Sequence, residues 1–220
     1  MSTPLVPITV LMDGKTGAGG AMNILVGTVM MATLVVGPFF LTFSLGLGEA
    51  VVEQVLAVGP VVAALSRVPS GWLIDRFGAR RVMLAGLVQT MLGLLCLAFL
   101  PRQFGVGGYI AALIVLTPAF QLFLAANNTA VMSGASKAQR WRLSGLLGLS
   151  RNLGLMTDAS AMSTLFVTVM GTGDAAEAAV ADVSRAFSAT FSAAAALVLI
   201  ALFLALWSHS GCERAATAPA

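Results

Sequence analysis

The sequence predicts an all-α integral membrane protein that crosses the bilayer six times. Hydrophobic residues make up 58% of the 220 residues and charged residues only 10%, whereas soluble domains carry roughly 25% charged residues. With a mean hydropathy of +0.94, the chain has too little polar surface to coat a water-soluble globule. Strands are not expected, because open sheet edges cannot face lipid and no alternating apolar pattern is present.

Six apolar segments are long enough to cross, because roughly 20 helical residues span about 30 Å of hydrocarbon. They are residues 21–45, 50–73, 81–100, 109–134, 143–170 and 186–208. Four prolines fall inside these spans and are expected to kink the helices without ending them: Pro38, Pro60, Pro69 and Pro118. The expected organisation is a cytoplasmic or interfacial N-terminal segment (1–20), a transmembrane domain (21–208) and a cytoplasmic tail (209–220).

The basic residues predict the orientation. Eight of the twelve Lys and Arg residues fall on one side of the six predicted spans: Lys15, Arg76, Arg80, Arg81, Lys137, Arg140, Arg142 and Arg214. Only Arg102 and Arg185 fall on the other side. By the positive-inside rule, both termini are cytoplasmic in a multi-pass protein of the plasma or inner membrane.

The sequence gives no reason to expect an enzyme. Two cysteines, Cys96 and Cys212, and the single histidine, His209, offer neither metal-ligand spacing nor a nucleophile–base arrangement. There is no glycine-rich nucleotide loop. No cofactor is therefore expected, and the basic residues of the short loops point to the membrane surface, not to nucleic acid.

The run GWLIDRFGARRVML places four ionic side chains between two long apolar segments. Asp75, Arg76, Arg80 and Arg81 cannot lie in hydrocarbon, so they mark a short cytoplasmic loop. Gly71 and Gly78 lack a Cβ, and this allows a tight turn and close helix approach.

The pattern Gly-x-Leu-x-Asp-Arg-x-Gly-x-Arg-Arg resembles the signature loop of a major facilitator superfamily repeat. The runs VGPFFLTFSLGLG, FLAANNTAVMSGA and SGLLGLSRNLG are similar to the C-terminal half of drug:proton antiporters of the fourteen-helix subfamily. Such transporters have two six-helix halves, each made of two inverted three-helix repeats, with the binding site between the halves. The resemblance implies one such half, which needs a second copy or a separate half, and a gating role for Asp75 and Arg76.

Some residues depart from that family pattern. Trp141 and Asp158 stand where small residues are usual, and Arg67 stands where a small or apolar residue is usual. These departures leave two alternatives open, a specialised transporter or a protein that has lost transport activity.

Ionisable residues inside the spans are candidates for function, because a charge at mid-bilayer costs roughly 2.5–3.5 kcal/mol on insertion scales. Arg151 and Asp158 are seven residues apart on one helix face. Asp158 is a candidate to exchange a proton or to pair with a cationic substrate, and Arg151 to hold an anion or to set the proton affinity of that carboxylate. The alternative is a structural charge pair, or snorkelling side chains, at a helix–helix seam. Glu53 is a further proton or cation candidate, with interfacial solvation as the alternative.

If the fourth and fifth helices form a hairpin, three amide side chains lie at about the same depth in the membrane as Arg151 and the residues that follow it. These amides are Gln121, Asn127 and Asn128. They are expected to hydrogen-bond Arg151 and Asn152 across that hairpin, either to hold the two helices together or as part of a site that contacts substrate. Met30, Met31, Phe39 and Phe40 are candidates to line an apolar cavity, with core or lipid packing as the alternative.

The expected function is proton-coupled efflux of small amphipathic compounds by a homodimer in lipid. Protonation of an intramembrane carboxylate would shift the balance between inward-open and outward-open states. The alternative is a non-transporting accessory subunit or an inactive remnant of a longer transporter.

Overall fold

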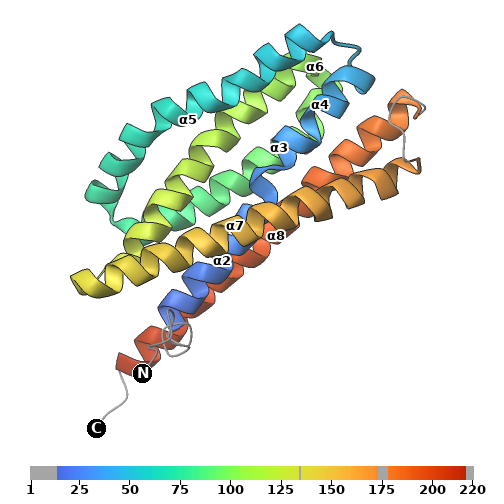
Figure 1. The fold of residues 1–220 in the computed structure, drawn as a ribbon. Helices are drawn as coiled ribbons and strands as arrows, with labels where there is room; N and C mark the ends of the chain where they lie inside the picture. Colours follow the sequence, from blue (N-terminus) through green and yellow to red (C-terminus); the bar gives the residue numbers. More distant parts are fainter. Residues whose placement is uncertain (1–13, 134, 173–177, 217–220) are drawn as a thin grey trace.

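The computed structural model describes residues 14–133, 135–172 and 178–216, so most of the predicted N-terminal segment lies outside the described residues. Within these ranges every regular element is a helix (Figure 1). Five helical stretches are long and apolar enough to cross a membrane, and this confirms the predicted all-α membrane fold. The elements are α2 (Gly14–Met30), α3 (Ala32–Val35), α4 (Gly37–Phe39), the π-helical turn η1 (Phe40–Ser44), α5 (Glu49–Phe77), α6 (Ala79–Met132), α7 (Lys137–Met170) and α8 (Val180–Ala216).

The longest element, α6, folds back on itself. Its 54 residues contain one non-helical position, Gly105, at φ 57° and ψ −134°, a conformation open to glycine because it has no Cβ. Gln89 in the first limb donates to the carbonyl of Val115 in the second at 3.1 Å, and Gly93 packs against Leu116. The two limbs are therefore antiparallel neighbours, as the ribbon shows (Figure 1). A straight helix of that length would extend about 80 Å, far beyond a bilayer.

The first predicted span forms, but it is interrupted. It consists of α2, α3, α4 and η1 in succession, with Met31 as a bend between α2 and α3. Pro38 lies in the first turn of α4, where its missing N–H does no harm. As expected, α5 continues through Pro60 and Pro69, and α6 continues through Pro118.

Several helices extend beyond the predicted spans. α7 begins at Lys137, earlier than the hydropathy suggested, because a capping box starts it: Ser136 N donates to Gln139 Oε1 at 2.9 Å and Gln139 N to Ser136 Oγ at 3.4 Å. α8 runs to Ala216, into the predicted tail, and α2 begins at Gly14. Hydropathy marks the part of a helix that lies in lipid and does not mark the helix ends.

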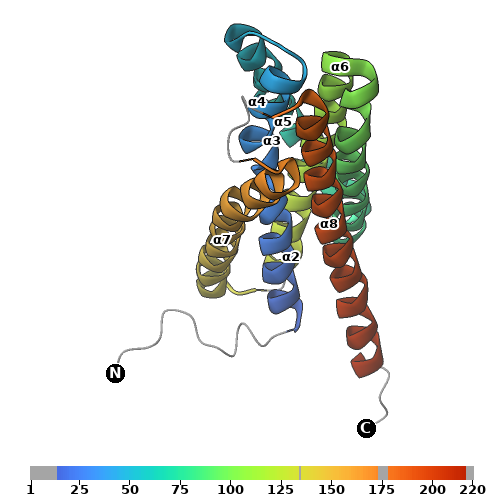
Figure 2. The ribbon, with the colours of Figure 1, turned by 90° about the vertical axis from the view of Figure 1, so that its right-hand side faces the viewer.

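The core of the bundle is aromatic on its α8 side and close-packed around α2. Phe40, Phe187 and Phe191 are fully buried, and the rings of Phe40 and Phe187 stack with centroids 4.1 Å apart. α2 lies against both α7 and α8 (Figures 1 and 2). α5 is peripheral, with Val68 81% exposed. The start of α2 and the end of α8 lie at the same end of the bundle (Figure 2).

Candidate functional site

The one acidic side chain that the described residues bury completely is Asp158, at 0% exposure in the middle of α7. Its Oδ2 accepts a hydrogen bond from the backbone N–H of Met31, at the bend between α2 and α3, and the amide of Ala32 interacts with the same carboxylate. Its Oδ1 has no hydrogen-bond partner within the described part of the chain. Oδ2 of this carboxyl group is therefore hydrogen-bonded to the backbone at the break in the first span, and Oδ1 is available to another partner.

Two glycines bring α7 close enough for this contact. A Cβ on Gly154 would lie 2.5 Å from the carbonyl oxygen of Ile24 and 2.9 Å from Gly27 Cα, so the two backbones touch. One turn closer to the start of α2, Asn23 Nδ2 donates to the carbonyl of Leu147 at 2.8 Å. Residue numbers rise together along this contact, so α2 and α7 run parallel.

The predicted pairing of Arg151 with Asp158 is not formed. Arg151 is exposed, and in the described ranges its side chain has no ion pair with Asp158. A spacing of seven residues places two side chains on one helix face, but it does not decide which of them the neighbouring helix covers. α2 covers Asp158 and leaves Arg151 outside.

The three amide residues, which were expected to act together, lie in different environments. Asn127 is buried and its Nδ2 donates to the carbonyl of Gly19 on α2 at 3.2 Å; Asn128 is exposed, and Gln121 is half-buried. The expected bonds from these amides to Arg151 and Asn152 are absent from the described residues. That expectation was wrong because α2 packs against both α6 and α7 and takes the polar contact.

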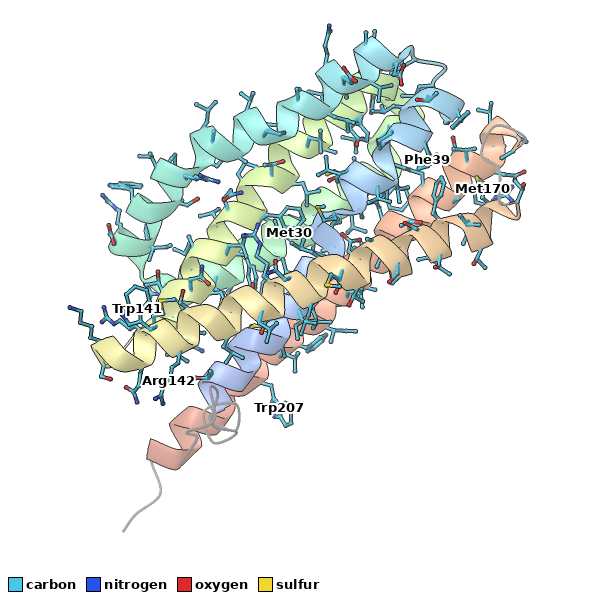
Figure 3. All side chains as sticks on the ribbon, viewed as in Figure 1. Met30, Phe39, Trp141, Arg142, Met170 and Trp207 are labelled. Carbon is cyan, nitrogen blue, oxygen red and sulfur yellow. The ribbon has the colours of Figure 1, made fainter. Side chains whose placement is uncertain are left out.

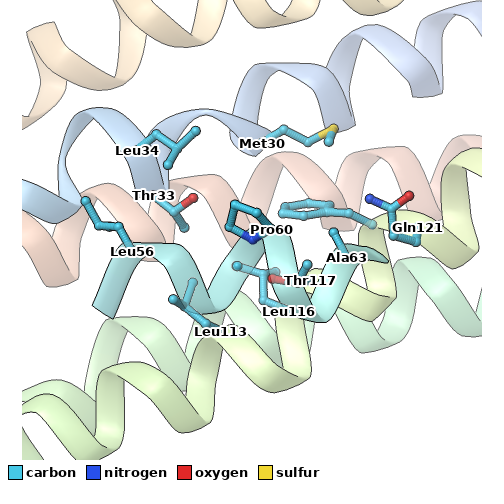
Figure 4. Close-up of a pocket in the computed structure, with 12 residues that line it drawn as sticks. Met30, Thr33, Leu34, Leu56, Pro60, Ala63, Leu113, Leu116, Thr117 and Gln121 are labelled. Carbon is cyan, nitrogen blue, oxygen red and sulfur yellow. The ribbon is translucent and has the colours of Figure 1, made fainter. Parts of the chain in front are cut away.

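Gln121 instead lines a pocket between the first span, α5 and the second limb of α6. Figure 4 shows Leu56 and Gln121 at opposite ends of this group, with Pro60 and Ala63 of α5 between them. The cavity holds ≈ 210 Å³. Its walls are mostly apolar, and the lining residues are Met30, Thr33, Leu34, Leu56, Gly59, Pro60, Ala63, Leu113, Leu116, Thr117, Phe120 and Gln121.

A second apolar pocket of ≈ 260 Å³ lies between the later part of the first span, from Val35 to Phe39, and the end of α7. Phe39 and Met170 line it from opposite sides (Figure 3). Of the four apolar residues predicted to line a cavity, Met30 and Phe39 do so, in different pockets. Phe40 is a core residue and Met31 is exposed.

The charged loop joins α5 to α6 through a single residue, Gly78, at φ 83° and ψ 146°. This conformation requires glycine, and it confirms the tight turn. A Cβ added at Gly71 would meet no atom within 4 Å, so no close helix approach occurs there. The four ionic residues Asp75, Arg76, Arg80 and Arg81 are exposed. The Arg76 guanidinium lies 5.3 Å from the centre of the Trp72 ring, a cation–π distance.

Glu53 and Arg67 both lie on α5 with exposed side chains. Trp141, whose bulk the sequence singled out, is 77% exposed in the second turn of α7. It lies beside Arg142 at the end of the bundle where α7 begins (Figure 3). None of these three positions belongs to the pocket or to the surroundings of Asp158.

Sequence reasoning missed the other polar members of the pocket, Thr33 and Thr117. Each pocket wall comes from a different helix, so no spacing along the chain could group them. The hydroxyl of Tyr109 donates to the carbonyl of Thr33 at 3.3 Å, and this contact ties the second limb of α6 to the first span beside the pocket.

The apolar helices, five of them long enough to cross a bilayer, identify a multi-pass membrane protein, and the buried carboxylate and the pocket are its candidate site. The sequence profile described as Major Facilitator Superfamily matches residues 20–215. The chain belongs to this superfamily.

Two known proteins show the extent of the likeness. The "Uncharacterized transporter YebQ" of Escherichia coli (strain K12) is 26% identical over 165 residues, which are 75% of this chain and 36% of that protein. The crystal structure of a mutant of the nucleoside transporter NupG superposes with a TM-score of 0.76 at 15% identity, covering 91% of this chain and 50% of the other. At that identity the second likeness shows the fold alone. The chain thus spans about a third of one relative and half of the other.

Proposed function

We propose that this chain is a six-helix unit of a secondary transporter that moves small amphipathic compounds out of the cell in exchange for protons. Support for six crossings comes from α2 and α7, which run parallel and so need an odd number of crossings between them. α5 and the two limbs of α6 supply three. The charge distribution favours cytoplasmic ends for both α2 and α8.

The observation that carries the proposal is the buried carboxyl group of Asp158. A carboxylate with one unpartnered oxygen is costly in a low-dielectric interior, and the cost is removed when that oxygen takes a proton. Asp158 is therefore a group whose charge depends on whether water and protons reach it. A transporter that opens alternately to the two sides changes that access in each cycle.

The pocket of ≈ 210 Å³ supports the substrate class. Ligand sites usually measure about 300–1,000 Å³, so this unit alone holds part of a ligand, and a second unit supplies the facing wall. Apolar walls with one amide and two hydroxyls suit a compound with an apolar body and a polar edge. A second copy of the chain or a separate half is the proposed partner.

The remaining candidates take different roles in this proposal. Gln121 is a direct substrate contact, because it faces the pocket. Asn127 holds helices together, since its amide is engaged by α2. Asn128, Arg151 and Glu53 are exposed on this unit, and they are candidates for contact with substrate or with the second unit.

The test is proton flux in proteoliposomes with an imposed pH gradient and a panel of lipophilic cations and neutral amphiphiles. The wild-type protein is expected to show compound-dependent proton flux, and Asp158→Asn is expected to reduce it to the level of empty liposomes. Asp182→Asn is the matched control, because Asp182 lies at the start of α8 and pairs with Arg185 at 3.2 Å. Equal flux in wild type and Asp158→Asn would contradict the proposal. Folded protein without flux for any compound would favour the accessory or inactive alternative.

A further inference from the structure

The first of the interruptions in the first span is at Met31. α2 ends at Met30, Met31 is non-helical by its hydrogen bonding, and α3 begins at Ala32. The chain resumes its helix from the bend itself, since the amides of Leu34 and Val35 both donate to the carbonyl of Met31, at 2.9 and 3.0 Å. The amide of Met31 is directed to Asp158 on α7.

The two sides of this break are held differently. On the inner side, α2 is fixed to α7 by the backbone contact between Gly27 and Gly154 and by the bond from Asn23 to Leu147. On the other side of the break, the first span packs on α6 and α8, through the bond from the Tyr109 hydroxyl to the carbonyl of Thr33 and the stacked rings of Phe40 and Phe187. The bond between Asp158 and Met31 therefore lies between a part of the first span that is held on α7 and a part that is held on α6 and α8.

The residues on either side of the break face the pocket. Met30, Thr33 and Leu34 form its first-span wall (Figure 4), while the amides of Met31 and Ala32 face Asp158. One turn of backbone thus carries a pocket wall on one side and the contact with the buried carboxyl group on the other.

We propose that residues 30–34 couple the charge of Asp158 to the shape of the pocket. This inference rests on the proposed function and names the element through which the proton acts. A charged acceptor binds an N–H roughly twice as strongly as a neutral one, so ionised Asp158 holds the bend on α7 and protonated Asp158 releases it. The bend then moves Met30, Thr33 and Leu34, and pocket occupancy changes the proton affinity of Asp158 in return.

Few other ionisable groups lie on the helices around Asp158 that could change the contact with the bend when they gain or lose a proton. Between residues 14 and 44 the only ionisable residue is Lys15, about 24 Å along the chain from the bend. The described side chains of α8 include one ion pair, Asp182 with Arg185, at its first turns. The other ionisable groups of α6 and α7 are Arg80, Arg81, Cys96, Arg102, Tyr109, Lys137, Arg140, Arg142 and the exposed Arg151.

The test is amide hydrogen exchange, followed by mass spectrometry, on the full chain in lipid nanodiscs without substrate. Asp158→Asn is expected to raise exchange at Met31 and Ala32 by up to about tenfold, the factor expected when a charged acceptor is replaced by a neutral one. Thr157→Val is the matched control on α7, because Thr157 is exposed and its hydroxyl bonds its own helix at Leu153. Unchanged exchange in Asp158→Asn, or an equal rise in Thr157→Val, would overturn the inference.

A pH series on the unmutated protein gives the same answer without a variant. After correction for the intrinsic exchange rate, protection at Met31 and Ala32 is expected to fall as the pH is lowered, because protonation weakens the acceptor. Protection that is constant with pH would overturn the inference. Lost proton flux in Asp158→Asn with unchanged exchange would leave Asp158 as a proton site but remove the coupling role. Altered exchange with normal proton flux would overturn both the coupling role and the proposed function.

Discussion

At the scale of single residues, three buried polar side chains join the first span to its neighbours. Asn23, Asn127 and Asp158 each form a hydrogen bond to or from a backbone group across a helix contact. Each also keeps one oxygen without a partner within the described residues. Hydrogen bonds between membrane helices contribute on average about 0.6 kcal/mol each, so these bonds fix register more than they add stability.

The close backbone contact between α2 and α7 leaves no room for an added side chain at Gly154. Gly154→Ala would push a Cβ to 2.5 Å from the carbonyl oxygen of Ile24, and α2 and α7 must then separate. Overpacking of this kind costs about 1–3 kcal/mol, so we expect a lower midpoint of thermal unfolding in detergent. Gly148→Ala is the control on the same helix, because no atom lies within 4 Å of its added Cβ. A fall of equal size in both variants would show that the contact between α2 and α7 does not matter.

At the scale of elements, the turn between α5 and α6 joins a peripheral helix to the longest one. Gly78 makes the turn possible, and the charged residues around it are exposed on this unit. Within the described ranges the Asp75 side chain takes no hydrogen bond or ion pair, so it is available to contact the start of another helix in one conformer. We propose this as its gating role.

Neutralisation of that carboxylate should then affect transport but not insertion. Asp75→Asn is expected to slow transport by about fivefold, the lower end of a typical coupling energy, while membrane-inserted protein, measured by immunoblot of washed membranes, stays at the wild-type level. An Asp75→Asn protein with the wild-type transport rate would leave the loop with a role in topology only. Asp182→Asn again serves as the comparison.

At the scale of the whole molecule, the pocket is open on one side and bordered by exposed apolar helix faces. Leu65 on α5 is 71% exposed, and α5 contributes a wall of the pocket. Among its described side chains, α8 by contrast contributes none to the pocket. A second unit that completes the pocket is therefore expected to lie along α5 and not along the outer face of α8.

Cysteine cross-linking in membranes can test this arrangement. With Cys96 and Cys212 replaced by serine, Leu65→Cys is expected to give a cross-linked dimer with a short bifunctional maleimide, and Phe203→Cys on α8 is expected to give little. Monomers alone in both variants, together with full transport, would contradict the proposed second copy. Cross-linking only through Phe203→Cys would place the second copy on α8 and contradict the expected interface along α5.

The sequence predicted the membrane class, the position of each apolar segment and the charged turn at Gly78, because these depend on local properties. Lipid excludes charge, a helix needs a certain length to cross, and a one-residue turn needs glycine. The spacing of Arg151 and Asp158 also placed both residues on one face of α7. It could not show that α2 covers one of them and leaves the other exposed.

By itself, therefore, the sequence determined that this protein is a bundle of apolar helices with one carboxyl group deep in the fifth predicted span. Only the tertiary structure decided which helix faces that carboxyl group, and that the first span is broken at the point of contact. The physical reason is that lipid solvates all apolar helix faces alike, so hydropathy does not select neighbours. Close fit does, and the contact between Gly27 and Gly154 exists only when two segments distant in the chain are placed together.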